Sequence, residues 1–166
     1  EMKDCSGINR FLRENEAFAS FELNASKSRC ILSLPSSFLF LSGGATIAQE
    51  VVVQLSSFLK EIRDRYELEG DAIRVDGHTD DVPLSKKGKY KNNWELSTVR
   101  ATNVAALMME KVGFNPERIA ISGYADTRPK ASYVSEDGNR KSGRELQKAR
   151  KENRRVELIF TRPTKK

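Results

Sequence analysis

A run of apolar residues at helical spacing, between positions 47 and 66, constrains the fold most strongly. Thr46 and Gln49 match a capping box, in which the later side chain reaches back to the cap, so a helix is predicted to begin at Thr46. The apolar positions that follow form one stripe: Ile47, Val51, Leu55, Phe58, Leu59, Ile62 and Tyr66. Such a stripe is typical of a helix that packs one side against a sheet or another helix.

Short strand patterns precede and follow this helix. Five strands are predicted from short apolar or alternating runs, over residues 18–23, 30–34, 72–76, 118–124 and 155–160. A turn at residues 24–27 joins the first two into a β-hairpin. Two further helices are predicted, over residues 93–112 and 144–151, and Gly113 follows the first of them as a C-terminal cap. This order predicts an α+β fold with helices packed on one face of a mixed sheet.

Cys5 and Cys30 are the only cysteines of the chain. A disulfide between them would close a loop of about 25 residues, which the chain-entropy model values at roughly 3 kcal/mol. It would also require an oxidising compartment such as the periplasm. Two free, buried thiols explain the same residues equally well, and two cysteines are too few for a structural zinc site.

The net charge of +6 is concentrated in one segment. Residues 139–155 hold eight basic residues against Glu145 and Glu152, so the rest of the chain is neutral. A surface of this charge attracts polyanions such as nucleic acid, anionic lipid or an anionic cell-wall polymer. The alternative is that these residues form one face of a helix that is exposed only to solvent. Only Phe160 lies near it as an aromatic residue, so the sequence does not support a surface that stacks nucleic-acid bases.

The only histidine, His78, is followed within three residues by Asp80 and Asp81. These three residues raise the hypothesis of a metal-dependent hydrolase, but a metal site needs about three protein ligands and no second histidine is present. A serine–histidine–aspartate triad would need Ser97 or Ser122, and neither lies in a nucleophile-elbow motif. A structural hydrogen bond is the commonest role for a single histidine of this kind.

Arg100 is an anomaly in the second predicted helix. At 100° per residue it lies on the apolar face defined by Leu96, Val104 and Leu107. A buried guanidinium needs an acceptor, because burying it unpaired is very unfavourable. Either its stem is buried and its charged end reaches water, or Arg100 faces a pocket where Asp80 or a ligand carboxylate meets it.

Four motifs occur in the chain in a fixed order: Gly77-His78-Thr79-Asp80, Asn93-Trp94-Glu95-Leu96-Ser97-Thr98-Val99-Arg100-Ala101, Gly123-Tyr124-Ala125-Asp126-Thr127-Arg128-Pro129, and Asn153-Arg154-Arg155-Val156-Glu157. Together they resemble the OmpA-like peptidoglycan-binding domain over about residues 39–160. The stretches 77–83 and 93–97 resemble most its MotB branch, the stator subunits of ion-driven motors. Residues 40–45 resemble the segment that precedes the first helix in that branch.

This resemblance implies a non-catalytic β-α-β-α-β sandwich over residues 39–163, preceded by an accessory segment, residues 1–38, that contains the β-hairpin. In the family, an aspartate and an arginine clamp the amino-acid end of diaminopimelate in the peptidoglycan stem peptide. Asp80 would bind the ammonium group and Arg100 the carboxylate. The same pocket would be lined by Asn93, Leu96 and the backbone near Thr79. Supporting roles fall to His78, Asn153 and Arg154, whereas Arg155 is expected to be exposed.

The resemblance also implies partners and a location. It implies binding to peptidoglycan, a homodimer, no cofactor or metal, and no nucleic acid. The domain would lie in the periplasm, held by an upstream transmembrane helix in the inner membrane beside a stator A-type subunit. A flagellar motor is the first expectation. Related motor systems, including anti-phage defence systems, and outer-membrane proteins or lipoproteins that carry this domain are the alternatives.

Overall fold

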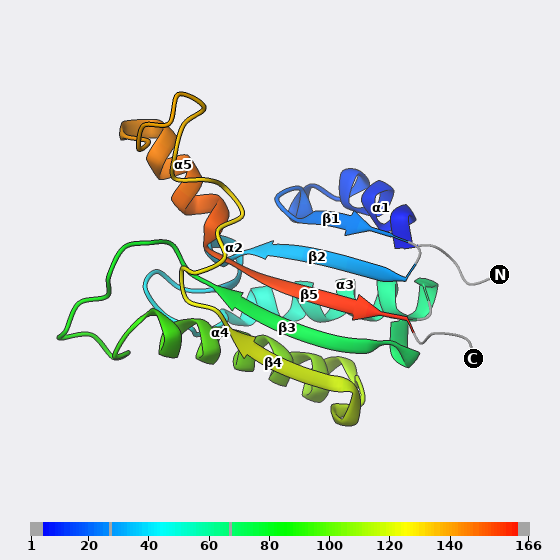
Figure 1. Ribbon diagram of the computed structural model, residues 1–166. Coiled ribbons are helices and arrows are strands. Elements are labelled where there is room, and N and C mark those ends of the chain that lie inside the picture. The colour runs from blue at the N-terminus through cyan, green and yellow to red at the C-terminus, as the bar shows by residue number, and fades with distance from the viewer. Residues whose placement is uncertain (1–4, 27, 67, 163–166) are drawn as a thin grey trace.

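The computed structural model describes residues 5–26, 28–66 and 68–162, and these form one five-stranded mixed sheet (Figure 1). The strands are β1 (Glu22–Ala25), β2 (Arg29–Pro35), β3 (Ala72–His78), β4 (Ile119–Gly123) and β5 (Arg155–Thr161). Their order across the sheet is β1-β2-β5-β3-β4. Only the pairing of β3 with β4 is parallel, and the other three pairings are antiparallel.

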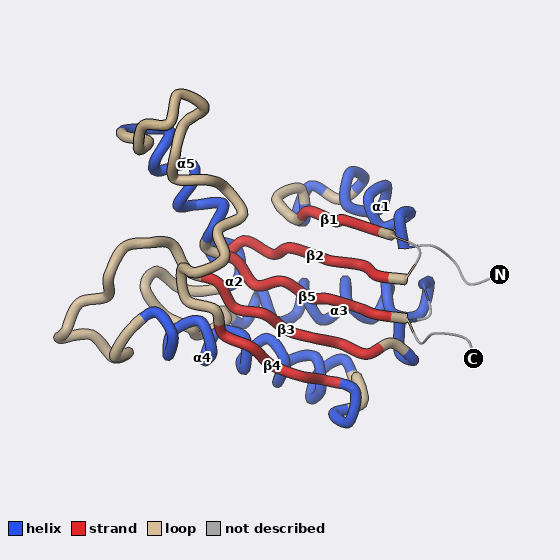
Figure 2. The backbone as a smooth tube through the Cα atoms, in the orientation of Figure 1, coloured by secondary structure: helices blue, strands red, loops and turns tan. Residues whose placement is uncertain are grey.

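The helices of the described chain lie mainly on one side of this sheet. They are α1 (Ile8–Glu14), α2 (Ser36–Leu39), α3 (Gln49–Tyr66), α4 (Asn93–Leu107) and α5 (Gly143–Asn153). The long helices α3 and α4 cover one face, and α5 projects away from the sheet (Figure 2). The predicted α+β fold, a mixed sheet with helices on one face, is confirmed. Within the described ranges, none of the helices combines the length and the apolar character needed to cross a membrane.

The core lies between the sheet and the helices α3 and α4. Five residues of the predicted stripe are buried there: Leu55, Phe58, Leu59, Ile62 and Tyr66. The start of this helix was predicted wrongly, because α3 begins at Gln49 rather than at Thr46. Ile47 forms an isolated β-bridge with Phe40, and the carbonyl of Thr46 accepts a hydrogen bond from the Leu41 amide at 3.2 Å. Thr46 therefore closes a turn and does not cap the helix.

Strands β1 and β2 pair in antiparallel fashion as a hairpin, and they belong to the same sheet as the other strands. Strand β2 lies between β1 and β5. The expected strand at residues 18–23 begins later, at Glu22, because residues 16–18 form a 3₁₀ turn that buries Phe18. Lys27, in the predicted turn, lies outside the described residues. Helix α1, which the sequence pattern did not predict, precedes this hairpin and buries Ile8 and Leu12.

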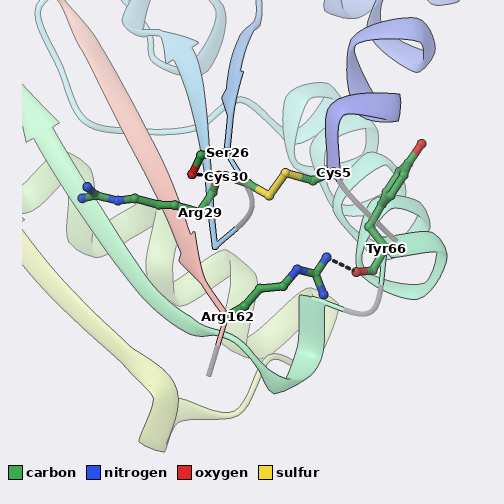
Figure 3. Close-up of a disulfide and its surroundings, with 6 residues drawn as sticks. All are labelled: Cys5, Ser26, Arg29, Cys30, Tyr66 and Arg162. Carbon is green, nitrogen blue, oxygen red and sulfur yellow. Dashed lines mark hydrogen bonds between the residues drawn. A yellow bond between two sulfur atoms is a disulfide. The ribbon is translucent and has the colours of Figure 1, made fainter. Parts of the chain in front are cut away.

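A disulfide joins Cys5 to Cys30 (Figure 3). The two Cα atoms are 6.4 Å apart, within the range that a disulfide spans. Cys30 lies near the start of β2, and Cys5 opens the 3₁₀ turn Cys5–Gly7 before α1. The bond therefore ties the first described residue to an inner strand of the sheet.

Candidate functional site

A cavity of about 470 Å³ opens where β3 ends. The residues after β3 form one wall, the first turns of α4 another, and α2 with the loop that follows it a third. Its polar and charged lining includes Thr79, Asp80, Asn93, Arg100 and Arg154. The cavity therefore brings together residues as far apart in the sequence as Ser36 and Arg154.

Two glycines allow α4 to lie directly on the strands beside this cavity. Gly77 of β3 and Gly123 of β4 are partners in the parallel register. A Cβ atom at position 77 would lie 2.0 Å from the Ser97 carbonyl oxygen, and one at position 123 would lie 2.1 Å from the Thr98 hydroxyl. The Ser97 hydroxyl also accepts a hydrogen bond from the Ala125 amide at 3.1 Å. These contacts fix the helix that carries Arg100 against the end of β3.

Asp80 is buried, and both of its carboxylate oxygens have hydrogen-bond donors. One oxygen accepts from the Val82 amide at 3.0 Å. The other accepts from Nη1 of Arg154 at 2.6 Å, in a charge-assisted contact. The position of the Asp80 side chain is therefore set by its own loop and by the residue before β5.

Arg100 is buried and lines the same cavity. Its Nε donates to the Gly44 carbonyl at 2.8 Å, and its guanidinium carbon lies 5.0 Å from the centre of the Phe40 ring. Burial lowers the pKa of Arg100 from its ordinary value. Asp80 is not its hydrogen-bond partner. The terminal guanidinium nitrogens have no hydrogen-bond partner among the described residues, so they can meet an acceptor that enters the cavity.

The remaining predicted lining residues also reach this cavity. The Asn93 side-chain amide donates to the Val82 carbonyl at 3.1 Å, so it fixes the loop after Asp80. Thr79 is buried, and its backbone amide donates to the Ala125 carbonyl at 2.9 Å. Leu96 supplies a buried apolar wall. The structure thus places these three residues around the pair Asp80 and Arg100.

Asn153 and Arg155 flank Arg154, and both are held by loops of the chain. Asn153 is buried, but its side chain holds the loop before α5: it accepts from the amides of Lys130 and Ala131, both at 2.7 Å. Arg155, which was expected to be exposed, is only 5% exposed. Its guanidinium donates to the carbonyls of Asn153 and Arg128, each at 3.1 Å, so the prediction of exposure was wrong.

The three residues of the metal hypothesis are held by different partners. His78 stacks on Tyr124, with ring centres 5.2 Å apart. Asp81 pairs with Arg140 and Arg150, whereas Asp80 pairs with Arg154. Among residues 5–26, 28–66 and 68–162, no group of three or more histidine, cysteine or acidic side chains is placed to hold a metal ion. The geometry gives no support to a metal-dependent hydrolase.

The basic segment divides into two sets. Arg140, Arg150 and Arg154 form the ion pairs that join α5 and its preceding loop to the rim of the cavity. Arg144 and Lys148 are exposed on the projecting helix. Part of the charge at residues 139–155 therefore positions α5, and part faces the solvent.

Glu157 lies across from Asp76 in the pairing of β3 with β5. One of its oxygens is 3.3 Å from Nε2 of His78, and the other is 3.5 Å from Nε of Arg155. Burial by itself raises the pKa of Glu157, but His78 and Arg155 outweigh burial and lower the pKa to about 2, from an ordinary value of 4.5. His78 therefore braces the sheet through Glu157 and Tyr124.

Replacing Glu157 by glutamine is expected to make stability less sensitive to acid. Because the pKa is lower in the folded state, ionised Glu157 stabilises the fold above pH 4.5, and this contribution disappears as the pH falls towards 2. The variant should lose on the order of 1–2 kcal/mol of unfolding free energy near neutral pH. Urea unfolding near neutral pH and near pH 2.5 should show this deficit shrinking in acid, and Glu152→Gln, at an exposed site, should show none. An equal deficit at both pH values would contradict the ion pairing.

Sequence reasoning missed three contributors to the cavity. Arg154 was given only a supporting role, yet it lines the cavity and pairs with Asp80. Phe40 and Gly44, which hold the Arg100 guanidinium, belong to a loop whose fold depends on the bridge to Ile47. The one available signal was Arg100 itself, because a buried guanidinium requires an acceptor somewhere in the chain.

The sequence is similar to that of a bacterial motility protein. Motility protein B of Bacillus subtilis (strain 168) is 28% identical over 156 residues, covering 93% of this chain and 54% of that protein. The chain thus spans about half the length of this curated relative.

Solved structures and a family model agree with this similarity. The periplasmic domain of Helicobacter pylori MotB matches with a TM-score of 0.69 and 28% identity, covering 87% of this chain and 83% of that one. The cell wall anchor of the T6SS from Pseudomonas aeruginosa matches with a TM-score of 0.72 and 25% identity, covering 93% and 96%. The model of the OmpA family matches residues 39–143, more than half of the chain. The chain belongs to the OmpA family, and within it resembles the MotB-type periplasmic domains.

Proposed function

We propose that this domain binds peptidoglycan without catalysis and so anchors a membrane complex to the cell wall. One observation carries the proposal: the buried guanidinium of Arg100 and the carboxylate of Asp80 line the same small cavity. A ligand with one carboxylate and one ammonium group complements such a pair. Membership of the OmpA family and the similarity to a cell wall anchor support this choice.

The ligand we propose is the free amino-acid end of diaminopimelate in a stem peptide. Arg100 would bind its carboxylate through the two terminal nitrogens, and Asp80 its ammonium group. Asn93 and the backbone at Thr79 would supply further polar contacts, and Leu96 the apolar wall. No proton transfer or bond cleavage is required of any residue in this arrangement.

The proposed setting is the periplasm. The similarity to Motility protein B and to a MotB periplasmic domain supports a stator B subunit of an ion-driven motor, flagellar or related. In this proposal residues 39–163 form the binding unit, and residues 1–38 complete its sheet and lead to an anchor in the inner membrane. The partners would be peptidoglycan, a second copy of the chain and a stator A-type subunit.

Co-sedimentation with purified peptidoglycan sacculi tests the proposed site. Asp80→Asn removes one charge with little change in side-chain volume, and Arg100→Gln replaces the guanidinium by a shorter, neutral polar side chain. Each is expected to weaken binding at least about tenfold, because a charge-assisted hydrogen bond to the ligand is lost. Exposed residues supply matched controls: Asp126→Asn and Arg144→Gln should sediment as the wild type does. Thermal unfolding of each variant verifies that it is folded. If both site variants sediment with sacculi as the wild type does, the assignment of this cavity is wrong.

A further inference from the structure

The cavity contains more positive charge than a zwitterion requires. Its only ionisable lining residues among those described are Asp80, Arg100 and Arg154, so the site carries a net charge of +1. A ligand end with one ammonium and one carboxylate is neutral overall and leaves that charge uncompensated. The second guanidinium, that of Arg154, is the group in excess.

Two backbone hydrogen bonds fix the position of Arg154. Its backbone amide donates to the Arg150 carbonyl at 3.1 Å, at the end of α5. Its carbonyl accepts from the Ser36 amide at 3.0 Å, at the start of α2. The backbone of Arg154 is therefore held from both sides, and its side chain extends to the rim of the cavity, where it is 36% exposed.

Arg154 also has unused donors. Only Nη1 contacts Asp80, and the other guanidinium nitrogens have no hydrogen-bond partner among the described residues. An ammonium group that approaches Asp80 must come close to this guanidinium, and the two positive charges repel each other. A second carboxylate on the ligand removes that repulsion by pairing with Arg154, in the planar geometry that favours arginine over lysine.

We propose that Arg154 binds a second carboxylate of the ligand, so that the site selects an amino-acid zwitterion with another free carboxylate in the same molecule. This inference rests on the proposed function and names its ligand class more narrowly. Asp80 and Arg100 hold the zwitterion, and Arg154 discriminates between a free carboxylate and an amidated one. Arg154 is then a specificity-determining residue as well as a partner of Asp80.

Two small probes test this assignment by calorimetric titration at low ionic strength. Both are meso-diaminopimelate acetylated on one amine, which leaves the other end as a zwitterion. The first probe keeps the free carboxylate beside the acetylated amine, and in the second this carboxylate is amidated. The wild type is expected to bind the free acid about tenfold more tightly than the amide, because amidation removes one charge-assisted hydrogen-bonding contact with Arg154. Arg154→Gln should bind both probes within about twofold of each other, and Arg154→Lys should retain part of the preference.

Arg150→Gln is the matched control, because Arg150 pairs with Asp81 and does not line the cavity. It should keep the preference of the wild type. Equal affinity of the wild type for both probes, or a full preference retained in Arg154→Gln, would overturn the inference and leave the proposed function standing. Failure of the wild type to bind either probe would overturn the proposed function, and the inference with it.

Discussion

Replacing Gly77 by alanine is expected to lower the free energy of unfolding by about 3 kcal/mol, the upper end of the usual cost of overpacking a core. The added Cβ would lie 2.0 Å from the Ser97 carbonyl oxygen and 2.8 Å from its carbonyl carbon. These are backbone atoms of α4, so no side-chain rotation relieves the clash. The helix must move away from β3, and Arg100 and Asn93 move with it. Urea unfolding measures the loss, and binding to sacculi should weaken as well.

Gly70→Ala supplies the control for this substitution. A Cβ atom there meets nothing within 4 Å, and the backbone does not have a positive φ. Its free energy of unfolding should change by less than about 1 kcal/mol. If Gly77→Ala is as stable as Gly70→Ala, then α4 does not lie against β3 as closely as the structure shows.

The close contact at Gly77 illustrates which parts of the fold could be predicted. Periodicity identified the strands and the long helices, because the apolar positions of α3 and β5 repeat at 3.6 and 2 residues. The same periodicity singled out Arg100 as a charge on an apolar face. The start of α3 was predicted wrongly because the capping box at Thr46 is a local pattern. The bridge between Phe40 and Ile47, which excludes Thr46 from the helix, is a non-local contact. Helix α1 was missed because seven residues are too few to establish a helical stripe.

The cavity was harder to predict than the elements that form it. Arg154 lies between α5 and β5, where neither period applies, so the sequence assigns its side chain to no face. The direction of that side chain follows from backbone hydrogen bonds to Arg150 of α5 and to Ser36 of α2, and the second of these residues is distant in the sequence. Arg155 was predicted to be exposed, and it begins β5 on the face of the sheet without α3. It is buried because the carbonyls of Arg128 and Asn153 cover it and accept hydrogen bonds from its guanidinium. Burial of a charged residue depends on such loops, and composition does not reveal them.

The disulfide is expected to shorten the path along which the domain bears load. In the proposed anchoring role, tension enters from the N-terminal side and leaves through the ligand in the cavity. With the bond intact, tension passes from Cys5 directly to Cys30, along β2 to Pro35, and into α2, whose Ser36 lines the cavity. The residues between the two cysteines, including all of α1 and β1, then lie outside the load path.

Reduction of this bond should therefore change both the stability and the extension of the domain under force. The unfolding free energy should fall by about 3 kcal/mol, because the denatured chain regains the freedom of a 25-residue loop. Pulled to full extension, the reduced domain should be about 80 Å longer, since each released residue adds about 3.5 Å. A Cys5→Ser, Cys30→Ser variant should match the reduced wild type and be insensitive to reductant. An oxidised domain that extends as far as the reduced one would show that tension does not pass through the two sulfur atoms, and the load path would then run through α1 and β1.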